Sequence, residues 1–343
     1  MQKLSYLFSV IFLVFFLSAC GQQQTQQKPV EINGKTMGTT YNIKVFPGPV
    51  SLEAQRFKQE VDEALVVVNQ SMSTYIPDSE INRFNRLEAN TVMPISSDFR
   101  AVIAESIRLG ESTKTLDVTM GPLIDLWGFG PDKRPTKRPS QSDIEAMQAN
   151  IGVNKLALTD EGLAKSLPHL ELSFSATAKG YGIDKVAELI EKKGLSNYMV
   201  EIGGELRISG NKPDGSPWRI AIEKPDAPAG QRQIHRVVEP GNNAIATSGD
   251  YRIFYEMDGE VFTHLIDPGT GRPVRHDLVS VTVLHPSAMT ADGLATALTV
   301  MGTQRARDYA EAHNLPVYLI SKTDAGLETF SSTAFKPYLD VKK

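Results

Sequence analysis

The sequence predicts an α+β protein, mostly antiparallel sheets with inserted helices. Residues 31–46 alternate between apolar and polar side chains, as an antiparallel strand does. Apolar residues between positions 57 and 68 recur at helical spacing. Asp258-Gly259 separates two further alternating segments, which is a strong hairpin signal. Hairpins interrupted by helices favour α+β over a doubly wound parallel sheet.

The remaining elements follow from the same patterns. Further helices are expected after Ser97, from a capping box at residues 142–145 to Gly152, and over residues 180–193, 291–300 and 304–313. Strands are expected at residues 155–158, 170–174, 197–202, 205–209, 218–223, 243–247, 252–257 and 260–265. Residues 115–130 are apolar but broken by glycine and proline, so an irregular packed loop is expected there. No repeat or internal linker divides residues 31–343, which predicts a single compact body.

Composition limits the function classes. The chain has 343 residues, of which 41% are hydrophobic, so it can bury a large core. The formal net charge is −4, and one short basic cluster at residues 133–138 lies among prolines. A nucleic-acid partner is therefore not expected.

The N-terminus predicts export and a lipid anchor. Lys3 precedes an apolar run over residues 4–17, and small residues follow it, so residues 1–19 are predicted to be a signal peptide. The next residue, Cys20, is the one cysteine of the chain, and its setting resembles the lipobox of bacterial lipoproteins. We expect residues 20–30 to be a lipidated cysteine followed by a flexible tether. The expected location is the periplasmic side of the inner membrane, although Gly21 leaves the choice between inner and outer membrane open.

Asp292 and Thr296 form a candidate metal site. They are one helical turn apart, so their oxygens share a face if a helix begins at Ala291. Oxygen donors suit Mg²⁺, which keeps several ligand positions for waters and substrate phosphates. The structural alternative is that Asp292 caps the helix and that Thr296 bonds back to its own backbone.

Two further segments are candidates for chemistry. His264, on an apolar strand pattern, is a candidate general base or else a satisfied core histidine. Residues 173–184 join a predicted strand to a helix through small side chains and include Lys179, an arrangement suited to phosphate or else to close packing.

Other nucleotide and metal motifs are rejected. Residues 33–36 resemble the end of a P-loop but lack its earlier glycine. The chain has no G-x-G-x-x-G after a strand, and no clustered Cys or His ligands for zinc.

A set of ordered motifs resembles the FAD:protein FMN transferase family, also called ApbE, over nearly the whole mature chain. The motifs are Met37-Gly-Thr-Thr-Tyr41, Ser73-Thr-Tyr75, Ile81-Asn-Arg-Phe-Asn85, Asp117-Val-Thr-Met-Gly-Pro-Leu123, Leu126-Trp-Gly-Phe-Gly130, Ala178-Lys-Gly-Tyr181, Gly203-Gly204, Thr247-Ser-Gly249, residues 264–273 and residues 291–296.

The resemblance implies an activity. Family members cleave FAD with magnesium and join the FMN half to a threonine hydroxyl of an exported protein, releasing AMP. The implied partners are flavoprotein subunits of sodium-pumping NADH:quinone reductase or Rnf-type complexes. The open alternatives are a FAD pyrophosphatase that yields FMN and AMP, and a flavin-binding lipoprotein without turnover.

The resemblance also implies roles for single residues. His264 corresponds to the base that activates the acceptor hydroxyl, and the metal ligands are Asp292, Thr296 and the carbonyl of Ala176. The residues implied to line the FAD site are Met37, Tyr75, Thr115, Leu116, Asp117, Ser173, Lys179 and Ile266. Many relatives have Asp where this chain has Ser173, and some have Asp where it has Ala295.

Overall fold

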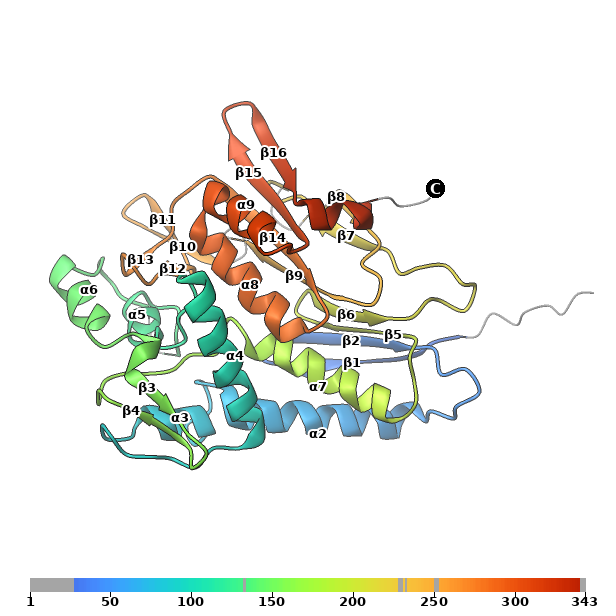
Figure 1. Ribbon diagram of the computed structural model, residues 1–343, viewed down its shortest axis with the longest axis horizontal. Coiled ribbons are helices and arrows are strands. Elements are labelled where there is room, and N and C mark those ends of the chain that lie inside the picture. Colours follow the sequence, from blue (N-terminus) through green and yellow to red (C-terminus); the bar gives the residue numbers. More distant parts are fainter. Residues whose placement is uncertain (1–27, 132–133, 228–230, 232, 250–252, 340–343) are drawn as a thin grey trace, which may run out of the picture.

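The computed structural model describes residues 28–131, 134–227, 231, 233–249 and 253–339 (Figure 1). The predicted signal peptide, Cys20 and most of the tether lie outside the described residues. The strands are β1 Val30–Thr36, β2 Thr39–Val45, β3 Leu156–Leu158, β4 Leu163–Lys165, β5 Tyr198–Ile202, β6 Glu205–Ser209, β7 Ile220–Glu223, β8 Ile234–Val238, β9 Ala244–Gly249, β10 Phe254–Met257, β11 Glu260–Thr263, β12 Ile266–Asp267, β13 Arg272–Pro273, β14 Leu278–His285, β15 Val317–Thr323 and β16 Gly326–Ser331. The helices are α2 Ala54–Met72, α3 Glu80–Asn85, α4 Ser97–Thr113, α5 Gly121–Leu126, α6 Gln141–Gln148, α7 Ala178–Lys192, α8 Ala288–Met301 and α9 Thr303–Ala312, with short 3-10 helices η2 Val153–Lys155 and η3 Thr333–Leu339. Within these ranges, no helix combines the length and apolar character needed to cross a membrane.

An eight-stranded sheet forms the centre, in the order β1-β2-β5-β6-β9-β14-β15-β16. Every neighbouring pair is antiparallel. Side chains alternate between its faces, as β14 shows, where Val281 and Val283 join one core cluster and Leu284 joins another. The predicted α+β class is therefore confirmed.

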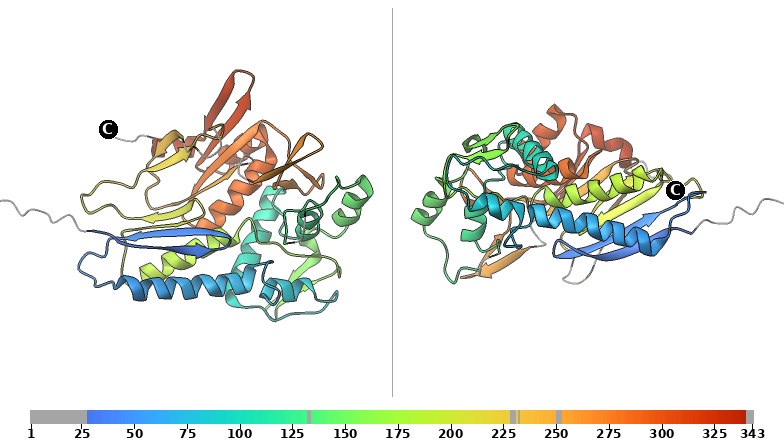
Figure 2. Two further views of the ribbon diagram at one scale, coloured as in Figure 1. Left: turned by 180° about the vertical axis from the view of Figure 1, so that it is seen from behind. Right: turned by 90° about the horizontal axis from the view of Figure 1, so that it is seen from below.

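Helices cover one face of this sheet (Figure 2). In α2 the apolar spacing places Phe57, Val61, Leu65 and Val68 on the buried side. Helices α7, α8 and α9 bury their apolar side chains in the same core as strands β2, β5 and β14. This layer brings the beginning of α7 against α8, where the candidate site lies.

The other face carries a smaller layer. Hairpin β7–β8 and η3 pack there, with Val238 and Phe335 in contact with Leu284 and Tyr318. A further lobe surrounds Trp127, which stacks on Phe262 of hairpin β10–β11 at 5.4 Å between ring centroids. This lobe holds α5, α6 and the strands beside His264 (Figure 1).

Several local predictions were wrong. Residues 31–46 form a hairpin instead of one strand, because Met37 and Gly38 adopt positive φ and reverse the chain. The expected loop at 115–130 contains helix α5, with Pro122 in its first turn. The capping box consists of Ser140 and Asp143, two residues earlier than expected. Residues 170–174 form no strand, and Glu171 makes only an isolated bridge to Met120.

Candidate active site

Helices α7 and α8 cross in direct backbone contact. A Cβ atom placed on Gly180 would lie 2.3 Å from the carbonyl oxygen of Ala288. One on Gly293 would lie 2.6 Å from Leu109 and 3.2 Å from Thr177. Glycine at both positions lets the first turn of α7 lie against α8.

The first turn of α8 is fixed by α7. Asp184 accepts hydrogen bonds from the hydroxyl of Ser287 at 2.7 Å and from the backbone N–H of Ala288 and Met289 at 2.9 and 3.0 Å. These bonds satisfy N–H groups that a helix start leaves without partners. Because α8 begins at Ala288, Asp292 lies in its second turn and does not cap it.

Asp292 is a buried carboxylate at this crossing, with 6% of its surface exposed. Its Oδ2 accepts a hydrogen bond of 3.0 Å from the backbone N–H of Gly180. Burial raises the pKa of Asp292 above its ordinary range, Lys179 opposes that rise, and Glu205 adds to it. A buried carboxylate is costly unless a cation offsets its charge.

Lys179 lies between two carboxylates. Its Nζ is 2.8 Å from Oε2 of Glu205 on β6 and 4.0 Å from Oδ1 of Asp292. The pair of carboxylates carries one more negative charge than the lysine neutralises. The surroundings of Asp292 therefore favour a second cation.

The two other predicted metal ligands are the hydroxyl of Thr296 and the carbonyl of Ala176. Thr296 is one turn further along α8, on the same face, and it is half-buried. In a regular helix the N–H of Gly180 would bond to the carbonyl of Ala176, four residues earlier, but here it bonds to Asp292. Among the described residues, no other backbone N–H donates to that carbonyl. The structure places Asp292 and Thr296 one turn apart in α8, and the donor set that they would form with the carbonyl of Ala176 stays a prediction, one whose carboxylate, hydroxyl and carbonyl oxygens suit Mg²⁺. No cluster of three or more acidic, His or Cys side chains suited to a metal occurs within the described ranges.

The segment of Thr115, Leu116 and Asp117 contacts α8. The Thr115 hydroxyl donates to the carbonyl of Ala297 at 2.9 Å, and Leu116 is buried in the main core. Asp117 is half-buried, and burial raises its pKa while bonds from Thr119 oppose that rise. Only Asp117 of the three therefore has a side chain partly open to a ligand.

Met37 lies in the β1–β2 turn, against Gly182 of α7. The neighbouring Thr39 and the stem of Lys179 both lie close to Gly203. A cavity of about 440 Å³ opens here, with Thr39, Gly203 and Gly204 in its wall. Thr39 and the glycine pair thus lie beside the stem of Lys179 at the edge of this cavity, whose lining does not include Asp292.

His264 follows strand β11 and is half-buried. Its Nδ1 lies 3.1 Å from the carbonyl oxygen of Ile253. A carbonyl only accepts, so Nδ1 carries the proton and Nε2 keeps a free lone pair. Burial lowers the pKa of His264 below its ordinary value, and the charge of Lys179 lowers it further. His264 is therefore neutral at pH 7, as a general base requires.

The other predicted residues lie further from this cluster. The backbone N–H of Ser173 donates to Val118 at 2.7 Å, which joins its segment to the one holding Asp117. Ile266 is buried in the lobe around Trp127. The side chain of Tyr75 is 68% exposed in the turn after α2. Across the described residues, no hydrogen bond or ion pair joins Tyr75 or Ile266 to Asp292.

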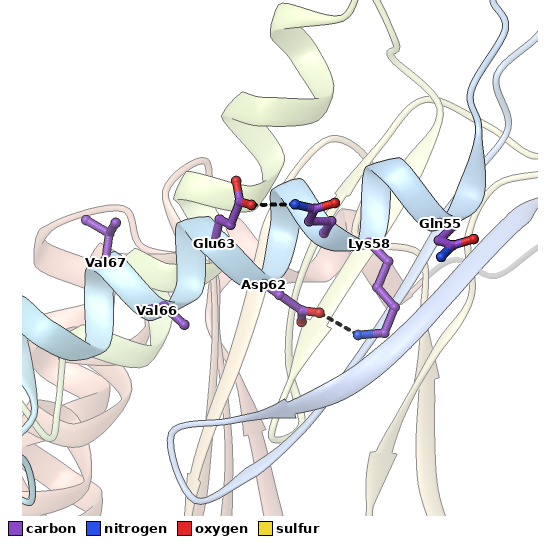
Figure 3. Close-up of a pocket in the computed structure, with 7 residues that line it drawn as sticks. Gln55, Lys58, Asp62, Glu63, Val66 and Val67 are labelled. Carbon is purple, nitrogen blue, oxygen red and sulfur yellow. Dashed lines mark hydrogen bonds and ion pairs between the residues drawn. The ribbon is translucent and has the colours of Figure 1, made fainter.

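A separate hollow of about 550 Å³ lies on the outer face of α2 (Figure 3). Its polar side chains pair with each other: Lys58 with Asp62 at 2.5 Å, and Gln59 with Glu63 at 2.8 Å. None of the predicted site residues lines it.

Comparison with known proteins shows the family of this chain. The model of the ApbE family matches residues 37–319. The chain belongs to the ApbE family.

A Vibrio cholerae protein named FAD:protein FMN transferase is 46% identical, and the match covers 95% of this chain and 96% of that protein. A Haemophilus influenzae protein of the same name is 45% identical over the full length of both. The crystal structure of the flavin transferase ApbE from Vibrio cholerae superimposes with a TM-score of 0.85 at 47% identity, covering 91% of this chain and 99% of that one. The resemblance to the ApbE family is thereby confirmed.

Two residues beside the candidate site were not predicted in this ApbE-family chain. Glu205 holds Lys179, and Gly180 supplies both the close helix approach and an N–H to Asp292. Glu205 directly follows Gly203-Gly204, and it is buried at the first position of β6. A buried acidic residue after a glycine pair is a signal that sequence inspection can use.

Gly180→Ala tests the helix crossing. Its Cβ would overlap backbone atoms of Ala288, which cannot rotate away, so we expect about 1–3 kcal/mol of destabilisation and loss of the bond to Asp292. The free energy of unfolding, from urea denaturation, measures the effect. Gly269→Ala is the matched control, because there the added Cβ meets only a side-chain oxygen at 3.3 Å. Equal stability of the two variants would contradict the close crossing.

Proposed function

We propose that this chain is a FAD:protein FMN transferase. It moves the FMN half of FAD to a threonine hydroxyl of an acceptor protein and releases AMP. The observation that carries the proposal is the buried Asp292 beside Lys179 at the first turn of α7, in a chain that matches proteins of this name from end to end.

The oxygens of Asp292, Thr296 and Ala176 fit a magnesium ion. The buried carboxylate, the half-buried hydroxyl and the carbonyl provide hard donors, and a bound cation would offset the burial that raises the pKa of Asp292. A bound Mg²⁺ would neutralise charge on the diphosphate of FAD during transfer.

The chain's own groups then position the substrate. Lys179 and the N-terminal N–H groups of α7 supply positive potential for the FAD diphosphate. Gly203 and Gly204 carry no side chain in the cavity wall, so a ligand can approach the backbone at these two residues.

His264 acts on the acceptor. Its Nε2 accepts the proton of the threonine hydroxyl, and the oxygen forms a bond to the phosphorus of the FMN half. The bond between that phosphorus and the bridging oxygen breaks, and AMP leaves with the oxygen.

Mass spectrometry of an acceptor domain tests the proposal. The domain is incubated with the purified chain, FAD and Mg²⁺, and we expect one FMN on a threonine together with release of AMP. Free FMN and AMP without a modified acceptor would show a FAD pyrophosphatase instead. Bound but unchanged FAD would show a flavin-binding protein without turnover.

We further propose that the enzyme is a lipoprotein on the periplasmic side of the inner membrane. The sequence around Cys20 supports this location, and the proposed acceptors are exported flavoprotein subunits of NADH:quinone reductase or Rnf-type complexes. Cys20→Ser should move the protein from the membrane fraction to the soluble periplasmic fraction, because one signal for anchoring is lost. Retention of that variant in membranes would contradict the lipid anchor, and separation of inner from outer membranes identifies the membrane.

A further inference from the structure

Hairpin β10–β11 has two unlike faces. Tyr255 and Phe262 are buried, stack at 5.5 Å and pack toward Trp127. On the opposite face, Phe254 and Val261 are each 50% exposed. Half-exposed apolar side chains on one face of a hairpin are typical of a binding surface when a groove lies beside them.

Such a groove is present. A hollow of about 620 Å³ lies between this face and the segments of β14, β15 and β16, and it is lined by Phe254, Val261 and Thr263 on the hairpin and by His276, Lys322 and Leu327 across from it. We refer to this hollow as the hairpin groove. It is distinct from the cavity beside Gly203 and from the hollow on α2.

The hairpin groove contains polar atoms without partners. Thr263 is 7% exposed, and its Oγ1 makes no hydrogen bond with any described residue. Within the same described ranges, neither ring nitrogen of His276 has a partner. Buried polar atoms are normally satisfied, so these atoms indicate a ligand that supplies both donors and acceptors. The peptide group supplies both.

Charge and position identify the ligand further. The lining holds three carboxylates, Asp226, Asp277 and Asp324, against one lysine, and Lys224 beside the groove pairs with Asp226 at 3.2 Å, so the acidic charge is still in excess. Thr263 is the last residue of β11 and directly precedes His264, so the groove lies at the strand end that the proposed base follows, while the His264 ring contacts Phe129 on the other face. We propose that the hairpin groove binds an extended, basic segment of the acceptor protein and guides its threonine to His264. This inference rests on the proposed function.

Enzyme kinetics test the surface. The acceptor is the FMN-carrying periplasmic domain of a sodium-pumping NADH:quinone reductase, prepared without flavin. We expect the double variant Phe254→Ser, Val261→Ser to raise the KM for this acceptor by about tenfold while kcat and the KM for FAD change less than twofold. The matched control is Val66→Ser, Val67→Ser, because these valines on α2 are 58% and 56% exposed (Figure 3). An unchanged KM in the groove variant, with a transferring wild type, would overturn the proposal.

Removing an acidic or a basic charge from the groove lining should change the KM for the acceptor in opposite directions. Asp324→Asn should raise the KM for the acceptor and Lys322→Gln should lower it, and both effects should shrink in high salt. Effects of the same sign would contradict a basic acceptor segment.

Photo-cross-linking separates this inference from the proposed function. A photoreactive phenylalanine analogue at position 261 should cross-link to the acceptor domain, and the same analogue at position 67 should not. This readout needs no turnover, so a cross-link at 261 without transfer would contradict the proposed function alone. Transfer without a cross-link at 261 would overturn the groove alone.

Discussion

Asp292→Asn is expected to lower the rate of FMN transfer by about 10³-fold, because it removes the charged ligand of the proposed magnesium site. Asparagine keeps an oxygen that can accept from the N–H of Gly180, so the local fold is retained. The rate is measured as AMP released in the presence of acceptor, over a range of Mg²⁺ concentrations. A chelator should reduce the wild-type rate at least as much.

Stability separates loss of the cation site from misfolding. Mg²⁺ should raise the melting temperature of the wild-type protein but not that of Asp292→Asn. Without metal, the variant should be at least as stable as the wild type, because burial disfavours the ionised carboxylate. Asp160→Asn, at an exposed carboxylate, is the control and should behave as wild type. Wild-type activity in Asp292→Asn would contradict the role of this carboxylate.

His264→Gln is expected to lower the transfer rate by about 10²- to 10⁴-fold while FAD binding persists. The side chain that accepts the hydroxyl proton is lost, whereas the groups around Asp292 are untouched. Equilibrium binding of FAD, followed by flavin fluorescence, serves as the control measurement. A rate within twofold of wild type would show that His264 is not the base.

The pH dependence gives a second readout of His264. Burial and the charge of Lys179 lower its pKa, so the histidine remains neutral to pH values below 6.5, and activity is lost only as pH falls through the lowered pKa. We expect the acid limb of the rate profile to lie below pH 6.5 for the wild type and to move upward in Lys179→Gln, where one cause of the shift is gone. Glutamine at 264 should abolish this limb.

Much of the fold could be predicted from local patterns. The buried residues of α2, the turn at Asp258-Gly259 and strands β5 and β6 follow directly from periodicity and turn chemistry. Strands β14, β15 and β16 were not predicted, although they form one side of the central sheet. In β14 five consecutive residues are buried between two layers, so no polar alternation marks it as a strand.

The candidate site could be predicted only in part. The helical spacing of Asp292 and Thr296 holds, because both lie within α8. The start of α8 was placed three residues late, since its cap depends on Ser287 and on Asp184, a residue distant in sequence. Contacts of Lys179 with Glu205 and Asp292 depend on the sheet order and the helix crossing, which local patterns do not contain. The roles of Tyr75, Ile266 and Ser173 stay predictions from the resemblance.

The central claim is that a divalent cation held by Asp292 and Thr296 meets the diphosphate of FAD. Anomalous diffraction from crystals grown with FAD and Mn²⁺, which replaces Mg²⁺ at oxygen sites, tests it most directly. We predict a manganese peak in contact with the carboxylate of Asp292, the hydroxyl of Thr296 and a phosphate oxygen of FAD. A manganese peak elsewhere, or FAD bound with its phosphates away from Asp292, would contradict the account.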